Sequence, residues 1–166
     1  YFVENKIGAF ASEKFCNDAI VFTPAIDRKS FWVEKNAFTL KSERTLLFYA
    51  RPQTALRNLF EVGVLALHVA ANRGLFADGD WRIYGIGEKF ESFKLTENLT
   101  LEYLPWLDFQ EYAKLIRNSD ILLSLMMAPH PSYPPLEIAA CGGLVVTNSF
   151  GTKTKRTLEA YSKNII

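Results

Sequence analysis

Four side chains that could contact a ligand lie close together between positions 130 and 137. His130, Ser132, Tyr133 and Glu137 follow an apolar run, in a segment stiffened by several prolines. A loop that leads into a helix N-terminus at the carboxyl end of a sheet is where open α/β folds bind anions. The segment 128–148 therefore predicts a ligand site.

Two arginines could supply positive charge for such a ligand. Arg51 directly follows an apolar run, and Arg57 falls in the first turn of a helix predicted from about residue 54 to 72. A cation is unfavourable there because the helix N-terminus already carries partial positive charge, and a bound phosphate would reverse that cost. The alternative is a pair of solvated arginines, with Arg57 paired to Glu61 four residues later.

Glu137 and His130 each have two interpretations. Glu137 is predicted in or near the first turn of a short helix, where it either stabilises the helix dipole or accepts hydrogen bonds from ribose hydroxyls. His130 lies between two prolines, which hold it extended. A neutral donor to a sugar hydroxyl or phosphate is favoured over a general base, because no neighbouring carboxylate orients the ring.

A pair of glycines, Gly85 and Gly87, follows another predicted strand and suggests a dinucleotide-binding loop. The third glycine of that pattern is replaced by Phe90, and no long helix follows at once. A glycine turn with close backbone approach is the favoured interpretation. The alternative is approach of the Gly87 backbone to a ligand.

These candidates are positioned by alternating apolar strands and amphipathic helices. Strands are predicted at 19–23, 45–50, 81–86, 99–104, 120–126 and 143–147, and helices at 1–17, 54–72, 109–118 and 136–141. Strands that alternate with helices form right-handed βαβ units. The sequence therefore predicts an α/β fold with a Rossmann-like, doubly wound parallel sheet.

Composition limits the classes of function. A chain of 166 residues fits one domain, and a net charge of +1 gives no general attraction for nucleic acid. No apolar run approaches the roughly 20 residues that a membrane-spanning helix needs. The two cysteines, Cys16 and Cys141, have no metal-ligand spacing, so a reducing cytoplasm is expected.

Several of these segments, in this order, resemble the C-terminal half of a GT-B glycosyltransferase. Within that fold the resemblance is closest to the WsaF-type rhamnosyltransferases of bacterial S-layer and surface-polysaccharide synthesis, related to glycosyltransferase family 4. It covers about residues 20–166, and the run from His130 to Glu137 is its most specific part. The segments that carry it are 48–52, 57–58, 81–89, the helix before Asp120, 129–137 and 146–148.

The resemblance implies a domain that binds a nucleotide-diphosphate sugar, in that family dTDP-β-L-rhamnose, as substrate and without a metal or another cofactor. It implies that the diphosphate lies against Arg51, Arg57, Ser132 and Tyr133, and against the amides of residues 132–136. Such a site would neutralise the leaving diphosphate as the glycosidic bond breaks.

The resemblance also implies where the rest of the donor lies. The nucleoside is expected at Glu137, Trp106 and Gly87, with the base near the loop 105–107. The sugar is expected near His130 and Tyr133. No catalytic residue is assigned, and His130 is the one candidate.

Two positions depart from the family pattern. Many relatives in family 4 have a second glutamate eight residues before the one that matches Glu137, and this chain has Pro129 there. Close relatives tend to carry a lysine where this chain has Trp106. More of the phosphate binding then falls to the arginines, and Trp106 could instead stack on a base.

The resemblance implies three parts of the chain. Residues 1–18 are expected to be the remnant of an N-terminal domain, 19–44 an interdomain region, and 45–166 a donor-binding domain without the usual C-terminal helix. The glycan or lipid-linked acceptor would bind the N-terminal domain, so this fragment alone is expected to be inactive. A cytoplasmic protein is expected, with peripheral association at the inner membrane face through a lipid-linked acceptor as a further expectation.

Two other functions stay open at this point. The same scaffold could use a UDP- or GDP-sugar as donor. Alternatively, the chain could be a nucleotide-binding or regulatory module with no transfer activity.

Overall fold

The computed structural model describes residues 24–34, 41–54 and 57–166. Its centre is a six-stranded sheet in the order β3-β4-β2-β1-β5-β6. The strands that pair in parallel are β1 (Glu43–Ala50), β2 (Asp80–Gly87), β4 (Thr100–Tyr103), β5 (Ile121–Ser124) and β6 (Leu144–Thr147). The predicted Rossmann-like α/β fold is confirmed. The predicted helix 1–17, the strand 19–23 and Cys16 lie outside the described residues.

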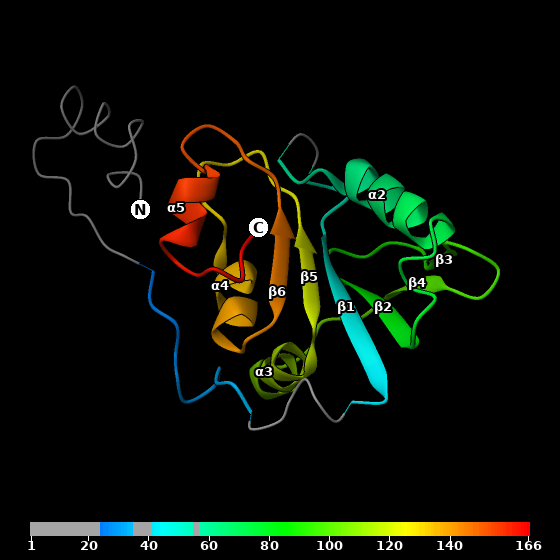
Figure 1. The fold of residues 1–166 in the computed structure, drawn as a ribbon, viewed down its shortest axis with the longest axis horizontal. Coiled ribbons are helices and arrows are strands. Elements are labelled where there is room, and N and C mark those ends of the chain that lie inside the picture. Colours follow the sequence, from blue (N-terminus) through cyan, green and yellow to red (C-terminus); the bar gives the residue numbers. More distant parts are fainter. Residues whose placement is uncertain (1–23, 35–40, 55–56) are drawn as a thin grey trace, which may run out of the picture.

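Helices cover both faces of the sheet, and the alternation of side chains along each strand explains why. Leu46 and Phe48 of β1 point into the cluster formed with α2 (Phe60–Asn72), whereas Leu47 joins the cluster formed with α3 (Phe109–Asn118) and α4 (Tyr133–Ala140). Strands buried on both faces read as continuous apolar runs. Figure 1 shows α2 beside the β1–β2 half of the sheet, and α4 and α5 (Lys155–Glu159) beside β6.

A glycine inside α2 allows that helix to lie close to the sheet. A Cβ atom added at Gly63 would lie 2.4 Å from the ring of Phe48. Glycine costs about 1 kcal/mol relative to alanine in a helix interior, and here the close packing of the ring on the helix backbone offsets that cost.

The helix predicted at 54–72 begins six residues later, at Phe60. Residues 51–54 instead form a turn that is hydrogen-bonded to Glu88, and Leu59 donates its amide to the carbonyl oxygen of Leu125. These long-range bonds hold the segment away from helical geometry. Arg57 therefore lies in a loop, so both the predicted position in the first helical turn and the alternative helical pair with Glu61 are wrong.

The helix predicted at 109–118 is confirmed, and its start has a local cause. Asp108 accepts a hydrogen bond from the amide of Glu111 at 2.8 Å, and the Glu111 side chain accepts one from the amide of Asp108. This reciprocal capping satisfies two amides that have no partner inside the helix.

Two short elements were not predicted, and one segment packs more closely than expected. The short antiparallel strand β3 (Phe93–Lys94) adds to the edge of the sheet, and α5 follows β6. Phe31, in the segment expected to be an interdomain region, is 4% exposed and lies edge-on to Phe109 of α3. This contact ties residues 24–34 to the described domain, while the predicted three-part division of the chain stays a prediction.

Candidate functional site

The order of the strands creates a crevice at the carboxyl edge of the sheet. The neighbours β1 and β5 lead to helices on opposite faces, α2 and α4, so the chain diverges after them. Such a switch point is where doubly wound folds bind ligands. We call residues 57–58 and 125–132 the switch-point loops; the amide of Met127 joins them by donating to the carbonyl oxygen of Arg57 at 2.7 Å.

A cavity of about 740 Å³ opens at this edge, between the ends of β1, β2 and β4 and the helices α3 and α4. We call it the rim cavity. Its lining includes Arg51, Gly87, Trp106 and Glu137. The structure thus brings together four of the predicted site residues from four separate segments of the chain.

Glu137 is held by a tyrosine that the sequence did not reveal. The hydroxyl group of Tyr112, on α3, donates to Glu137 Oε2 at 2.5 Å. Burial raises the pKa of Glu137, and this hydrogen bond partly opposes the rise, because it favours the ionised form. Because α4 begins at Tyr133, Glu137 lies in the second turn and not in the first, so the helix-dipole explanation for it loses its basis.

Trp106 lies at the edge of the rim cavity with 89% of its surface exposed. A large apolar ring is usually buried, and an exposed one beside a cavity is available to stack on a flat ligand group. Leu104 and Leu107 line the cavity on either side of it in sequence.

Gly87 ends β2 with a backbone conformation that favours glycine, at φ 126°. A Cβ atom there would lie 2.4 Å from the carbonyl oxygen of Ala50, so the glycine allows β1 and β2 to approach closely at the edge of the cavity. Gly85 lies within β2, and its Cβ atom would lie 2.3 Å from the side-chain ring of Phe90. Because β2 continues through Gly87, the predicted glycine turn is wrong, whereas the predicted close backbone approach is confirmed at Gly87.

Of the two arginines, Arg51 lines the rim cavity and Arg57 does not. Arg51 Nε donates to Glu88 Oε1 at 3.2 Å, and its side chain is 33% exposed. Among the described residues, no hydrogen bond reaches its two terminal amino groups. Those two groups have the planar, forked geometry that suits a phosphate. Arg57 is exposed on the adjoining loop.

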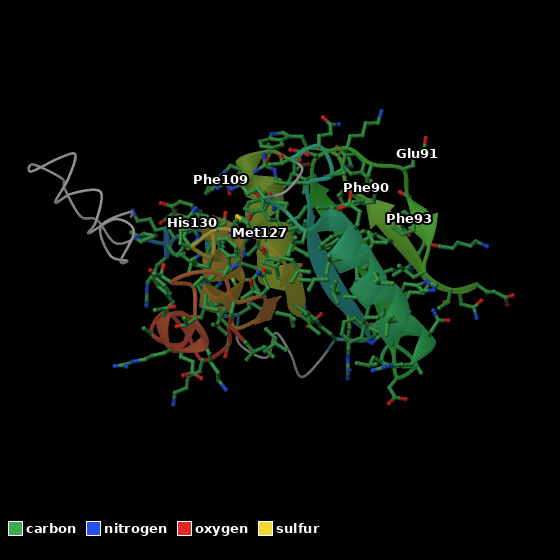
Figure 2. All side chains as sticks on the ribbon, turned by 90° about the horizontal axis from the view of Figure 1, so that it is seen from above. Phe90, Glu91, Phe93, Phe109, Met127 and His130 are labelled. Atoms are coloured by element: carbon green, nitrogen blue, oxygen red, sulfur yellow. The ribbon has the colours of Figure 1, made fainter. Side chains whose placement is uncertain are left out.

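His130, Ser132 and Tyr133 lie outside the cavity lining, on the loop that enters α4 and in its first residue. The amide of Ser132 donates to His130 Nδ1 at 3.2 Å, which assigns the proton of the neutral ring to Nε2. Burial and the nearby charge of Lys153 lower the pKa of His130. Both effects favour the neutral donor that the sequence predicted. Figure 2 labels His130 and Met127 on this loop.

The first turn of α4 offers fewer amide donors than the sequence suggests. Ser132 uses its amide for His130, and Pro134 and Pro135 have no N–H group. Prolines fit these positions because the first amides of a helix need no internal partner. Tyr133 then carries the first-turn amide that could face an anion.

Lys153 is a buried cation that sequence reasoning missed. It is 1% exposed, and its Nζ atom donates to the carbonyl oxygen of Met126 at 2.9 Å, directly before the loop of His130. Burial lowers the pKa of Lys153 to about 8. No local pattern distinguishes this lysine from a surface lysine. Glu88 differs from Lys153 in this respect. It directly follows Gly87, the last residue of β2, and this position in the sequence indicates a role at the edge of the sheet.

Two kinds of feature are absent from the part of the chain that the structure describes. No helix among residues 24–34, 41–54 and 57–166 is long and apolar enough to cross a membrane. The same residues contain no group of three or more His, Cys, Asp or Glu side chains that could hold a metal ion.

Comparison with known proteins links the domain to a family. The model of the family "WsaF, C-terminal domain" matches residues 44–166. The chain is also similar to the O-antigen biosynthesis protein RfbC of Myxococcus xanthus, with 32% identity over 153 residues. That alignment covers 87% of this chain and 11% of RfbC, so the chain spans about a ninth of the length of that relative.

Proposed function

This chain belongs to the WsaF C-terminal domain family of GT-B glycosyltransferases, and we propose that its rim cavity binds the nucleoside of a nucleotide-diphosphate sugar donor. The observation that carries the proposal is the convergence of Arg51, Trp106 and Glu137 on one cavity of about 740 Å³. A flat ring, a carboxylate and a guanidinium group suit the base, the sugar and the diphosphate of a nucleotide. Pockets of this volume hold ligands of that size.

Each of the three groups has a distinct role in the proposal. Trp106 stacks on the base, Glu137 accepts a hydrogen bond from the sugar of the nucleoside, and Arg51 binds the diphosphate. During transfer Arg51 neutralises the charge that develops on the leaving diphosphate, which lowers the barrier of the reaction. Arg57, His130, Ser132 and Tyr133 then face the outer part of the diphosphate and the transferred sugar.

We propose dTDP-L-rhamnose as the donor. Tyr112 already occupies one oxygen atom of Glu137, so the other oxygen suits a single hydroxyl group. The deoxyribose of dTDP offers one such group, at its 3′ position, whereas the ribose of UDP or GDP offers two. The similarity to an O-antigen biosynthesis protein supports transfer onto a surface polysaccharide or another glycan. The acceptor would bind another part of a longer protein.

A panel of nucleotides tests the function and separates it from the alternatives. Thermal unfolding is measured with dTDP, UDP, GDP and NAD, because a ligand at 100 times its Kd adds about 2.7 kcal/mol to stability. We expect the largest rise in Tm with dTDP. A larger rise with UDP or GDP would indicate a different donor, and a response to NAD alone would indicate a cofactor-binding module.

A pair of glutamate variants links the binding to the cavity. Glu137→Gln keeps the size of the side chain and removes its charge, and we expect about a tenfold loss of affinity for thymidine and dTDP alike, because a hydrogen bond to a charged group contributes about 1.5–3 kcal/mol. The control is Glu102→Gln, which removes the same charge from an exposed position on β4. Equal affinities in the two variants would contradict the assignment of Glu137.

A further inference from the structure

The carboxylate of Glu88 has an unusually complete set of hydrogen bonds for a group at the edge of the sheet. Oε2 accepts from the amides of Gln53 and Thr54, at 2.7 and 3.1 Å. Oε1 accepts from Arg51 Nε at 3.2 Å and from the hydroxyl group of Thr54. Four donors therefore surround one carboxylate, and all four belong to the turn that follows β1.

This set of contacts determines the position of the turn. Residues 51–54 form no helix, and within the turn Thr54 donates its amide to the carbonyl oxygen of Arg51 at 3.3 Å. Glu88 itself is fixed, because its amide donates to the carbonyl oxygen of Ala50 at 2.9 Å and it directly follows the constrained Gly87. The side chain thus connects the end of β2 to the start of the loop after β1.

The contact with Arg51 uses only one edge of the guanidinium group. Nε is bound to Glu88, and the two terminal amino groups have no hydrogen bond among the described residues. A guanidinium held at Nε turns less freely, so the orientation of its two terminal amino groups is restricted, and Arg51 lines the rim cavity. A preorganised fork binds a phosphate with less loss of side-chain entropy than a mobile one.

The bonds to Gln53 and Thr54 have a second consequence. Successive backbone amides in a turn often form a small pocket for an anion. Here the carboxylate of Glu88 fills that pocket, and the hydrogen bonds from Thr54 and Gln53 lower its pKa, so the group stays ionised at neutral pH. The turn therefore contains its own anion, and Arg51 remains as the cation in the lining of the rim cavity.

From this geometry we infer that Glu88 is a positioning residue for the diphosphate. Glu88 lines the rim cavity beside Arg51, but both oxygen atoms of its carboxylate are occupied by the turn, so it orients Arg51 and does not itself bind the ligand. The inference rests on the proposed function, because it assumes that Arg51 binds a diphosphate. A simple electrostatic effect would have the opposite sign, since a carboxylate beside Arg51 repels an anionic ligand. The sign of the change in affinity therefore separates positioning from charge repulsion.

The test compares a nucleoside diphosphate with its nucleoside. Calorimetric titrations compare dTDP with thymidine. If the nucleotide panel favours UDP or GDP, the pair is UDP and uridine, or GDP and guanosine. For Glu88→Gln and Glu88→Ala we expect affinity for the diphosphate to fall about tenfold and affinity for the nucleoside to stay within a factor of two. The nucleoside serves as the measure of an intact fold in each variant.

The control and the double variant complete the test. Glu91→Gln removes the same charge from an exposed side chain near β3, which Figure 2 shows on the outer edge and away from His130 and Met127. We expect no change there. Adding Glu88→Ala to Arg51→Ala should cause no further loss, because Glu88 acts through Arg51.

Three results would overturn the inference. The first is that Glu88→Gln binds the diphosphate more tightly than the unmodified chain does. The second is that a Glu88 variant loses as much affinity for the nucleoside as for the diphosphate. The third is that the losses of affinity caused by Arg51→Ala and Glu88→Ala add up in the double variant. The proposed function fails separately, when the unmodified chain binds none of the nucleotides in the panel.

Discussion

The rim cavity and the switch-point loops share one edge of the sheet but are built in different ways. The cavity is lined by residues of β1 and β2 and of the segments that follow them, and by the loop before α3, α3 and α4. Its polar groups are held by defined partners, such as Tyr112 for Glu137. By contrast, Arg57 on the switch-point loops and Tyr133, the first residue of α4, are exposed, and the bonds that join the two loops are made by the backbone.

This difference indicates where specificity is already present in the chain. Groups that are oriented before binding lose little entropy when the ligand arrives, so the proposed nucleoside site in the cavity is already preorganised. The exposed groups on the loops gain their orientation only when a ligand contacts them. We therefore expect substitutions in the cavity to affect binding more strongly than substitutions on the loops.

The two arginines give the largest expected contrast. We expect Arg51→Ala to weaken dTDP binding by about thirtyfold, since hydrogen bonds to charged groups contribute about 2 kcal/mol. Arg57→Ala, on the exposed loop, should weaken it by about threefold. Titration calorimetry with thymidine as the uncharged control measures both. A larger loss for Arg57 would reverse the comparison between cavity and loops.

The exposed tryptophan gives the next effect. Stacking of a base on an aromatic side chain contributes about 1–3 kcal/mol, so Trp106→Ala should weaken thymidine and dTDP equally, by about tenfold. Trp106→Phe should retain most of the affinity. The matched control is Trp32→Ala. Trp32 is an exposed ring that lies against Arg117 and outside the lining of the rim cavity, so this change should leave both affinities unchanged.

Lys153 tests the region beneath the switch-point loops through stability. Its pKa falls to about 8 in the folded protein, from an ordinary value of 10.5. The unfolded chain then binds more protons between these two values, so stability rises with pH there and the cost of burying the charge is full below pH 8. From pH 7.5 to 9.0 we expect a gain of about 1 kcal/mol.

Urea unfolding at several pH values measures this gain, with Lys153→Met for comparison. The variant should lack the part of the pH dependence that Lys153 supplies, while all other titrating groups remain. Identical pH profiles in both proteins would show that Lys153 keeps an ordinary pKa.

The smallest expected effect concerns the partner of Glu137. Tyr112→Phe removes the 2.5 Å hydrogen bond that lowers the pKa of Glu137, so this pKa should rise further. Because the protonated carboxyl is a poorer acceptor, thymidine binding should weaken about threefold at acidic pH and remain nearly unchanged at neutral pH. Titrations across this range measure the shift. Tyr103→Phe, outside the cavity, should keep the unmodified profile.

The sequence was sufficient for the layout of the sheet. The apolar runs of β1 and β5 and the amphipathic pattern of α3 predict their elements, because burial on both faces or on one stripe leaves a periodic trace in the chain. The start of α2 was predicted wrongly, since its signal is nonlocal: the turn before it is held by Glu88, 34 residues from Thr54.

The sequence by itself determined the fold class, the close backbone approach at Gly87 and the residues that could meet at the edge of the sheet. The tertiary structure decided which of them share a cavity, that Tyr112 holds Glu137, and that Lys153 is buried. Periodicity and turn chemistry act within a few residues of one another, so they can be read along the chain. Partners and burial depend on segments that the fold brings together from distant positions.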